Sequence, residues 1–259
     1  MSAIRAKKLS IPCDRTELAG GAFIPDDPKG TLVLLHGMPS SLAPPAGTLD
    51  YPTLAHRLAG NRWATVWADM RAVRGSAGYF SIEGWVRDAR AIADAARSLH
   101  PTEDLPSAFV ATSAGGAVAV EATRRGAPVD AVVLLAAPAA WVSFAVDAHD
   151  AARRAVKDNG LALSPEDLAD PVEWAAEFDR VTTEESIASL NTPVLIVHGD
   201  ADAVVPVSHA HRLGDRAPHA ELRIIAGGEH NLRQDQAVMT MVEAWLEKTF
   251  ADLPRRDPA

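Results

Sequence analysis

The stretch Ala111-Thr112-Ser113-Ala114-Gly115-Gly116 decides the fold of this chain. It follows an apolar run and opens a helical pattern, so Ser113 falls on a sharp turn between a strand and a helix. Such a turn needs strained backbone angles at the serine and small residues two positions before and after it. Ala111 and Gly115 meet that need, although the usual G-x-S-x-G pattern has glycine at both positions. We expect the turn to expose the Ser113 hydroxyl for attack on an electrophile.

The composition predicts one globular domain. A chain of 259 residues can form a single large α/β domain, and 47% hydrophobic with 23% charged residues is an ordinary balance for a folded protein. The lone cysteine, Cys13, excludes an internal disulfide and fits a reducing compartment. The sequence shows no signal peptide and no membrane-spanning apolar run, and a net charge of -9 disfavours nucleic acid as a partner. We expect a soluble, cytoplasmic protein with a small-molecule substrate, and the oligomeric state is left open.

Around the turn, short β-rich runs alternate with longer helical patterns, which is typical of a parallel sheet with crossover helices. The expected parallel strands are Thr31–His36, Trp63–Ala68, Ala108–Ala111, Ala131–Ala136, Val194–Val197 and Glu221–Ile225. The expected helices are Tyr51–Leu58, Glu83–Leu99, Ala114–Arg125, Ser208–Arg216 and Gln234–Phe250. Two earlier runs, Arg5–Ile11 and Leu18–Ile24, predict an antiparallel β ribbon.

One segment interrupts the alternation. From Val142 to Leu190 the sequence is helical and acidic, with 11 Asp and Glu residues against 4 Lys and Arg. A crossover needs only about a dozen residues, so we expect an insertion that forms a small helical cap within a single domain spanning residues 1–259. Its acidic side chains form either a solvated face or a barrier to anionic substrates. The aromatic residues that either line a substrate pocket or pack the cap against the sheet are Trp141, Phe144, Trp174 and Phe178.

A serine becomes a nucleophile when a base takes its proton and a carboxylate holds that base. Asp200 and Asp202 follow the strand expected at Val194–Val197, and His230 follows the strand expected at Glu221–Ile225. The chain order is Ser, Asp, His, and all of them fall at the carboxyl edge of one sheet, where open α/β sheets place their sites. We take Ser113 as the nucleophile, His230 as the base, and Asp200 or Asp202 as the acid.

The loop His36-Gly37-Met38-Pro39 also follows an expected strand. Its backbone N–H at Met38, with the N–H of Ala114, is the candidate oxyanion hole for a tetrahedral intermediate. Of the other histidines, His198 is expected to be structural, and His209, in a polar helix, is expected to be solvated. The histidines and aspartates show no metal-binding spacing, so the sequence predicts neither a metal nor a cofactor.

Taken together, these features resemble the α/β-hydrolase superfamily over nearly the whole chain. The matching motifs are Leu34-Leu35-His36-Gly37, the turn at Ser113, His198-Gly199-Asp200-Ala201-Asp202 followed by Pro206, and Gly227-Gly228-Glu229-His230. The loop from Asp69 to Gly78 looks like that family's D-x-R-G-x-G-x-S motif in an altered form. The resemblance implies an α/β-hydrolase fold, with a mostly parallel sheet and helices on both faces. It also favours Asp202 over Asp200 as the acid.

The resemblance implies serine-nucleophile chemistry but no particular substrate. We expect hydrolysis of small, uncharged, partly apolar carboxylic esters through an acyl-enzyme. An aminopeptidase, a thioesterase, a perhydrolase or a carbon–carbon hydrolase would use the same triad. The alternative of another class is a catalytically silent ligand-binding protein that keeps the fold, because fold does not guarantee function.

Overall fold

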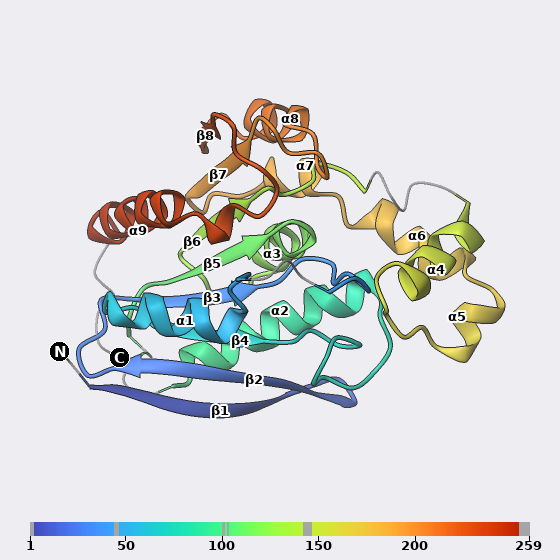
Figure 1. The fold of residues 1–259 in the computed structure, drawn as a ribbon, viewed down its shortest axis with the longest axis horizontal. Coiled ribbons are helices and arrows are strands. Elements are labelled where there is room, and N and C mark those ends of the chain that lie inside the picture. The colour runs from blue at the N-terminus through green and yellow to red at the C-terminus, as the bar shows by residue number, and fades with distance from the viewer. Residues whose placement is uncertain (1–2, 44–46, 100–101, 103, 142–146, 254–259) are drawn as a thin grey trace.

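The computed structural model describes residues 3–43, 47–99, 102, 104–141 and 147–253. In this part of the chain eight strands form one sheet in the order β1-β2-β4-β3-β5-β6-β7-β8 (Figure 1). The strands are β1 (Ile4–Cys13), β2 (Thr16–Pro25), β3 (Thr31–Leu35), β4 (Ala64–Ala68), β5 (Ser107–Thr112), β6 (Ala131–Leu135), β7 (Val194–Gly199) and β8 (Glu221–Ile225). β1 and β2 form the expected antiparallel ribbon, β2 joins β4 antiparallel, and the strands from β3 to β8 run parallel. The mostly parallel sheet predicted from the sequence is confirmed.

Helices cover both faces of the sheet, and a further group lies at one end of the molecule (Figure 1). They are α1 (Tyr51–Gly60), α2 (Ile82–Arg97), α3 (Ala114–Arg124), α4 (Ala148–Lys157), α5 (Pro165–Ala169), α6 (Val172–Arg180), α7 (Thr183–Ile187), α8 (Ser208–Arg216) and α9 (Gln236–Ala251), with a short 3-10 helix η1 at Leu232–Gln234. Apolar residues of α1 and α9 share one core cluster with one face of the sheet. Those of α2, α3 and α8 share the other cluster with the opposite face.

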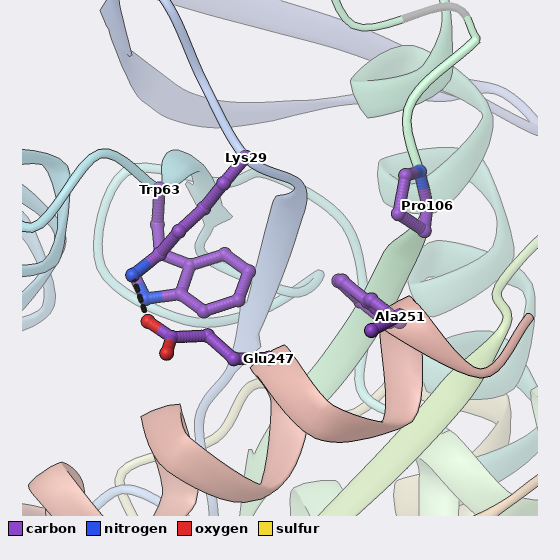
Figure 2. A pocket seen from close by; sticks show the side chains of 6 residues that line it. Lys29, Trp63, Pro106, Glu247 and Ala251 are labelled. Carbon is purple, nitrogen blue, oxygen red and sulfur yellow. Dashed lines mark hydrogen bonds and ion pairs between the residues drawn. The ribbon is translucent and has the colours of Figure 1, made fainter.

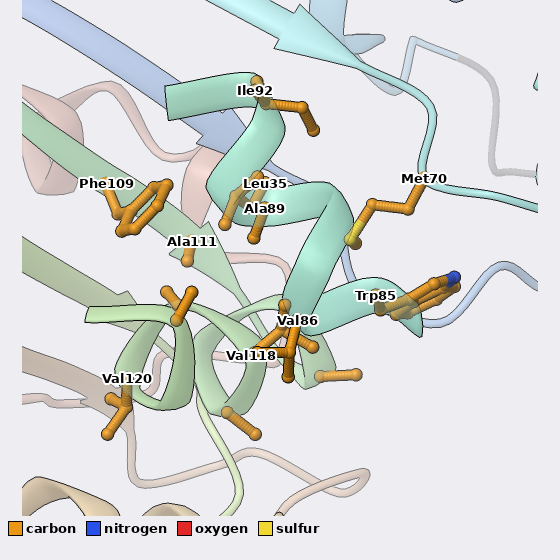
Figure 3. Close-up of a cluster of buried hydrophobic side chains, with 14 of the residues drawn as sticks. Leu35, Met70, Trp85, Val86, Ala89, Ile92, Phe109, Ala111, Val118 and Val120 are labelled. Carbon is orange, nitrogen blue, oxygen red and sulfur yellow. The ribbon is translucent and has the colours of Figure 1, made fainter. Parts of the chain in front are cut away.

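The alternation of side chains along the central strands explains the two layers. All residues of β3, β5, β6 and β7 are buried, as expected of parallel strands covered on both faces. Leu32 and Leu34 of β3 belong to the cluster with α1 and α9, whereas Val33 and Leu35 belong to the cluster with α2 and α3. Figure 3 shows this second cluster, with α2 and α3 covering Leu35 and the β5 side chains.

Local signals fix where the site's helices begin. The Asp50 side chain accepts a hydrogen bond from the Thr53 N–H and starts α1, and Ser81 does the same for Gly84 at the start of α2. α3 begins directly after Ser113, with no side-chain cap, because β5 turns straight into the helix. The start of α9 differs from the expectation: Gln234 lies in η1, and Asp235 caps α9 from Gln236 onward.

The helices α4 to α7 lie between β6 and β7. We call residues 147–190 the helical insertion; residues 142–146 of the expected cap, including Phe144, lie outside the described residues. Figure 1 shows α4, α5 and α6 clustered at one end of the molecule, beside one end of α2. α6 packs against α2, whereas α7 packs against α3 and α8. The insertion therefore contacts the body of the protein on the side of the sheet that carries α2 and α3.

Candidate active site

Ser113 occupies a strained turn between β5 and α3. Its backbone angles are φ 52° and ψ −126°, a conformation that residues other than glycine rarely adopt. The N–H of Ser113 donates to the carbonyl of Leu135 at 2.8 Å, and its carbonyl accepts from the Gly116 N–H at 2.8 Å. Hydrogen bonds on both sides hold the strained conformation in place. Strain of this kind is maintained where the surroundings enforce it, and it is common at functional sites.

The residues around the turn leave no room for a side chain at Gly115 or Gly116. A Cβ added at Gly115 would lie 2.4 Å from the His36 carbonyl oxygen, and one at Gly116 would lie 2.5 Å from the Ala137 Cβ. Ala111 is completely buried in the same region. A Cβ at Gly37 would lie 2.9 Å from the Ser113 Cβ and 3.4 Å from its Oγ. The turn and the loop after β3 are thus in direct contact, as an oxyanion hole would require.

His230 and Asp202 are joined by a hydrogen bond. The His230 Nδ1 lies 2.8 Å from the Asp202 Oδ2, and the carboxylate is inaccessible to solvent. An ionised carboxylate only accepts, so Nδ1 carries the proton and Nε2 is left as the basic nitrogen. The other oxygen, Oδ1, accepts from the N–H groups of Val204 and Val205, each at 2.8 Å. Asp202 is therefore held in one orientation and presents its second oxygen to His230.

Asp200 has a different position. Its Oδ1 accepts a hydrogen bond from the Gly227 N–H at 2.7 Å, in the loop that carries His230. The Ala201 N–H donates to the Gly228 carbonyl at 3.0 Å and ties the same two loops together. Of the two aspartates left open by the sequence, Asp202 is thus the one that contacts His230. Asp200 joins the loop after β7 to the loop after β8.

A buried histidine supports the acid. The His198 Nε2 lies 2.8 Å from the Val205 carbonyl and 3.3 Å from the Asp202 Oδ2. Its Nε2 therefore carries the proton, and burial lowers its pKa, so the ring stays neutral. The sequence predicted a structural role for His198, but nothing in its local pattern indicated that it reaches the Asp202 carboxylate.

Ser113 and His230 lie on loops at the same edge of the sheet, after β5 and β8. Among the described residues no hydrogen bond joins the Ser113 hydroxyl to His230, whereas the bond from His230 to Asp202 is formed. Catalytic hydrogen bonds are often absent or long in a protein without substrate and form when the substrate binds. The described part of the chain thus holds the base and the acid together without a hydrogen bond from the base to the serine hydroxyl.

His36 orients the candidate oxyanion amide. The Met70 N–H donates to the His36 Nε2 at 2.9 Å, so Nδ1 carries the proton and donates to the Gly37 carbonyl at 2.8 Å. That carbonyl belongs to the same peptide unit as the Met38 N–H, and in a trans peptide the two point in opposite directions. Binding the carbonyl of Gly37 therefore aims the amide of Met38 the other way. Among the described residues no protein group accepts from the Met38 or the Ala114 amide.

The neutral state of His36 follows from its surroundings. The ring is buried, with Trp85 edge-on at 5.3 Å, and burial lowers the pKa of His36 to about 4. Arg71, next to Met70, is fixed by an ion pair between its guanidinium and the fully buried Asp88 at 2.7 Å. The Asp88 carboxylate also accepts from the Arg71 backbone N–H at 2.8 Å. This buried pair holds the loop from which Met70 reaches His36.

The aromatic side chains proposed for a pocket lie in a packed cluster. Trp141 is 7%, Trp174 2% and Phe178 3% exposed. The indole N–H of Trp174 donates to the Phe80 carbonyl at 3.0 Å, and that of Trp141 donates to the Val181 carbonyl. As the structure stands, these three residues pack the helical insertion against the body of the protein. A role for them in lining a substrate pocket stays a prediction.

His209 differs from the sequence expectation. It was expected to be solvated on a polar helix, but it is buried, and its Nδ1 accepts a hydrogen bond from the Ala139 N–H at 3.0 Å. The expectation was wrong because α8 turns the face that carries His209 and Leu213 toward the sheet. In the described ranges no group of three or more His, Cys, Asp or Glu residues is placed to hold a metal ion, and no helix is long and apolar enough to cross a membrane.

Two surface hollows lie away from the candidate triad. The first, of about 240 Å³, is lined by Lys29, Trp63 and Pro106, each just before a strand, and by residues of α9 (Figure 2). It lies at the amino edge of the sheet, whereas Ser113 lies at the carboxyl edge. Lys29 is paired with Glu247 and sits over the Trp63 ring at 4.4 Å, so its charge is already balanced. The second hollow, of about 300 Å³, lies between the start of β7 and the end of α9.

Comparison with known families gives one match over most of the chain. The sequence model of the family described as "Serine aminopeptidase, S33" matches residues 26–163 and 171–237. These ranges include Ser113, Asp202 and His230. A curated protein of Synechocystis sp., named "Putative non-heme chloroperoxidase", is 35% identical over 65 residues. That match spans 25% of this chain and only 22% of the length of that relative.

Solved structures show the same fold. Est1E from Butyrivibrio proteoclasticus, in a structure with ferulic acid bound, superposes with a TM-score of 0.68 at 21% identity, covering 94% of this chain and all of that one. The acylaminoacyl peptidase of Pyrococcus horikoshii superposes with a TM-score of 0.69 at 13% identity, covering all of this chain and 44% of that one. At these identities the likeness concerns the fold alone.

Proposed function

The chain belongs to the serine aminopeptidase S33 family of the α/β-hydrolase superfamily, and from this premise we propose that it is a serine hydrolase acting through Ser113, His230 and Asp202. The observation that carries the proposal is the strained backbone of Ser113, at φ 52° and ψ −126°, on the turn between β5 and α3. Strain at a residue whose side chain makes no capping hydrogen bond to α3 and does not belong to the core needs a reason other than stability. Presenting a nucleophile is that reason.

In the first half of the proposed reaction the Ser113 Oγ attacks the carbonyl carbon of an ester while the His230 Nε2 takes its proton. Asp202 keeps the proton of His230 on Nδ1 and stabilises the imidazolium that forms. The negative charge that develops on the carbonyl oxygen is bound by the N–H groups of Met38 and Ala114. When the tetrahedral intermediate collapses, His230 returns the proton to the departing alkoxide, and the acyl group stays on Ser113.

The second half repeats these steps with water. His230 takes a proton from a water molecule, the hydroxide attacks the acyl-enzyme, and the same two amides bind the oxyanion. Collapse releases the carboxylic acid and returns the proton from His230 to Ser113. Each group used in these steps belongs to the chain, and the proposed reaction requires no cofactor.

We propose small, uncharged, partly apolar carboxylic esters as the substrates. The acidic helical insertion, which we propose acts as a cap over the site, would disfavour anionic substrates. The cytoplasmic location also stays a proposal.

An aminopeptidase is the second candidate, because the family carries that description. It would need a carboxylate beside the site to hold the substrate's amino group. A thioesterase or carbon–carbon hydrolase would use the same triad.

The test is hydrolysis of p-nitrophenyl acetate and butyrate by the wild type and two variants. Ser113→Ala and His230→Ala should each lower turnover by about four to six orders of magnitude, with melting temperatures close to that of the wild type. Ser98→Ala is the matched control, because Ser98 lies at the end of α2 remote from the turn. Aminoacyl p-nitroanilides measured in parallel separate the esterase from the aminopeptidase. A well-folded wild type that turns over neither class would favour a silent ligand-binding protein.

A further inference from the structure

The helical insertion is hydrogen-bonded to the segment that carries the candidate oxyanion amide. The side-chain amide of Asn159 donates from Nδ2 to the Pro39 carbonyl at 2.8 Å. Beside it, the Ser41 N–H donates to the Asp158 carbonyl at 2.9 Å. Pro39 and Ser41 lie one and three residues after Met38, whereas Asp158 and Asn159 directly follow α4. Two regions more than a hundred residues apart in sequence thus meet at the loop after β3. We call residues 36–41 of this loop the oxyanion loop.

Asn159 is presented from a rigid turn. The N–H groups of Asp158 and Asn159 both donate to the Arg154 carbonyl, at 2.9 and 3.2 Å, and the Gly160 N–H donates to the Val156 carbonyl at 3.1 Å. Gly160 has φ +65°, which ends the helix in the left-handed conformation that glycine adopts without strain. The backbone of Asn159 is therefore fixed on both sides, and its amide is oriented before any substrate binds.

The oxyanion loop needs such a contact because little else holds its far side. On the near side, His36 binds the Gly37 carbonyl at 2.8 Å. Beyond Pro39 the chain is exposed from Ser40 to Ala43, and Leu42 is 78% exposed. Pro39 has no N–H, so the peptide unit after Met38 has no donor with which to anchor the loop. The Pro39 carbonyl, bound by Asn159, anchors it instead. His36 and Asn159 hold the carbonyls on either side of Met38, one from the body of the protein and one from the insertion.

We propose that Asn159 is a positioning residue through which the helical insertion fixes the Met38 amide in the oxyanion hole. This inference rests on the proposed function and extends it: the insertion takes part in stabilising the transition state as well as in covering the site. Without the Asn159 hydrogen bond the insertion holds the loop only through Ser41, three residues beyond Met38. The segment between Gly37 and Ser41 can then shift and displace a donor that must lie about 3 Å from the oxyanion. A displacement of about 1 Å at such a site costs up to about a hundredfold in rate.

The test compares Asn159→Ala and Asn159→Asp with the wild type on p-nitrophenyl butyrate. The aspartate variant keeps the shape of the side chain and removes the N–H donor. Both should lower kcat by roughly tenfold to a hundredfold with little change in KM, because the lost interaction exists mainly in the transition state. Ser164→Ala is the matched control, since it removes a hydrogen bond within the insertion, to the Asp167 N–H, that does not involve the oxyanion loop.

A second measurement separates positioning from general loosening. The Ser113 Oγ adds to the carbonyl carbon of a trifluoromethyl ketone, His230 takes the serine proton, and the resulting oxyanion lies in the oxyanion hole. The matching methyl ketone binds mainly without reacting. In both Asn159 variants, Ki for the trifluoromethyl ketone should rise by about the same factor as kcat falls, and Ki for the methyl ketone should stay within about twofold of the wild type.

The outcomes are distinct. Equal losses for both ketones would show a merely structural role and overturn the inference, as would wild-type kcat in either variant. A wild type that hydrolyses no ester or amide would instead refute the proposed function itself, and the inference with it. If Asn159→Ala is unfolded at the assay temperature, the aspartate variant and its ratio of the two Ki values still decide whether Asn159 positions the Met38 amide.

Discussion

Replacing Gly115 with alanine tests the contact between the nucleophile turn and the oxyanion loop. The new Cβ would lie 2.4 Å from the His36 carbonyl oxygen and 3.0 Å from the Leu35 carbonyl oxygen. Cβ atoms in folded proteins essentially never come closer than 3.0 Å to another heavy atom, so the His36 carbonyl must retreat by roughly 0.6 Å. Both contacts are to backbone atoms at the end of β3, and no flexible side chain can absorb the shift.

The displaced carbonyl lies one peptide before the unit that carries the Met38 amide. A shift of that size at one oxyanion donor should lower kcat/KM for p-nitrophenyl butyrate by about tenfold to a hundredfold. The added methyl group should also destabilise the protein by about 1–3 kcal/mol, as overpacking does in a filled core. Steady-state kinetics give the first quantity and urea unfolding the second.

The matched control is Gly60→Ala, because a Cβ at Gly60 would meet no atom within 4 Å. It should leave kcat/KM unchanged. If Gly115→Ala keeps the wild-type kcat/KM while the variant remains folded, the contact between Gly115 and the end of β3 does not position the oxyanion loop, and the reasoning is refuted.

Three further predictions concern the acid, the turn and a buried histidine. Asp202→Asn should lower kcat by about three to four orders of magnitude because it removes the charge that faces His230. Asp200→Asn should lower kcat by less than about tenfold, since Asp200 binds Gly227 instead. The opposite ranking in a kinetic assay would transfer the acid role to Asp200. Ala111→Gly should keep activity, whereas Ala111→Val should disrupt the turn, so a fully active valine variant would contradict the strained geometry. Burial lowers the folded-state pKa of His36 from 6.5 to about 4, so the unfolded chain binds a proton first and stability should fall as pH drops from about 6.5 to 4. Urea unfolding of the wild type and His36→Gln at pH 7 and pH 4.5 checks this, since the variant should lose less stability over that interval.

The core of the fold could be predicted from the sequence because its signals are local. The strands lie within two residues of their expected bounds, since runs such as residues 131–135 are continuously apolar and wholly buried. The turn at Ser113 was likewise marked by small residues in fixed positions. Both signals depend only on neighbours in the chain.

The loop after β4 has the backbone of the D-x-R-G-x-G-x-S motif without its glycines. Ala72 and Arg74, at φ 63° and 41°, occupy the two positions where the D-x-R-G-x-G-x-S pattern has glycine. Both residues therefore have the left-handed backbone conformation for which the pattern uses glycine, the residue that adopts it without strain. The Arg74 guanidinium pairs with Asp69, which holds one of these turns in place.

The contacts that complete the candidate site could not be predicted, because they join distant segments. Asn159 reaches Pro39 across 120 residues, and His209 reaches Ala139 across 70. Neither pair has a spacing or composition that marks it. The polar composition of the segment predicted that His209 would be solvated, and gave no sign that its side chain would be buried against Ala139.

The most direct test of the central claim is the reaction of the purified protein with a fluorophosphonate, followed by intact mass and peptide mapping. The account predicts one covalent adduct, on Ser113, formed by displacement of fluoride by the Ser113 Oγ, and no adduct in Ser113→Ala. An adduct on another serine, or no adduct on a folded wild-type protein, would contradict it.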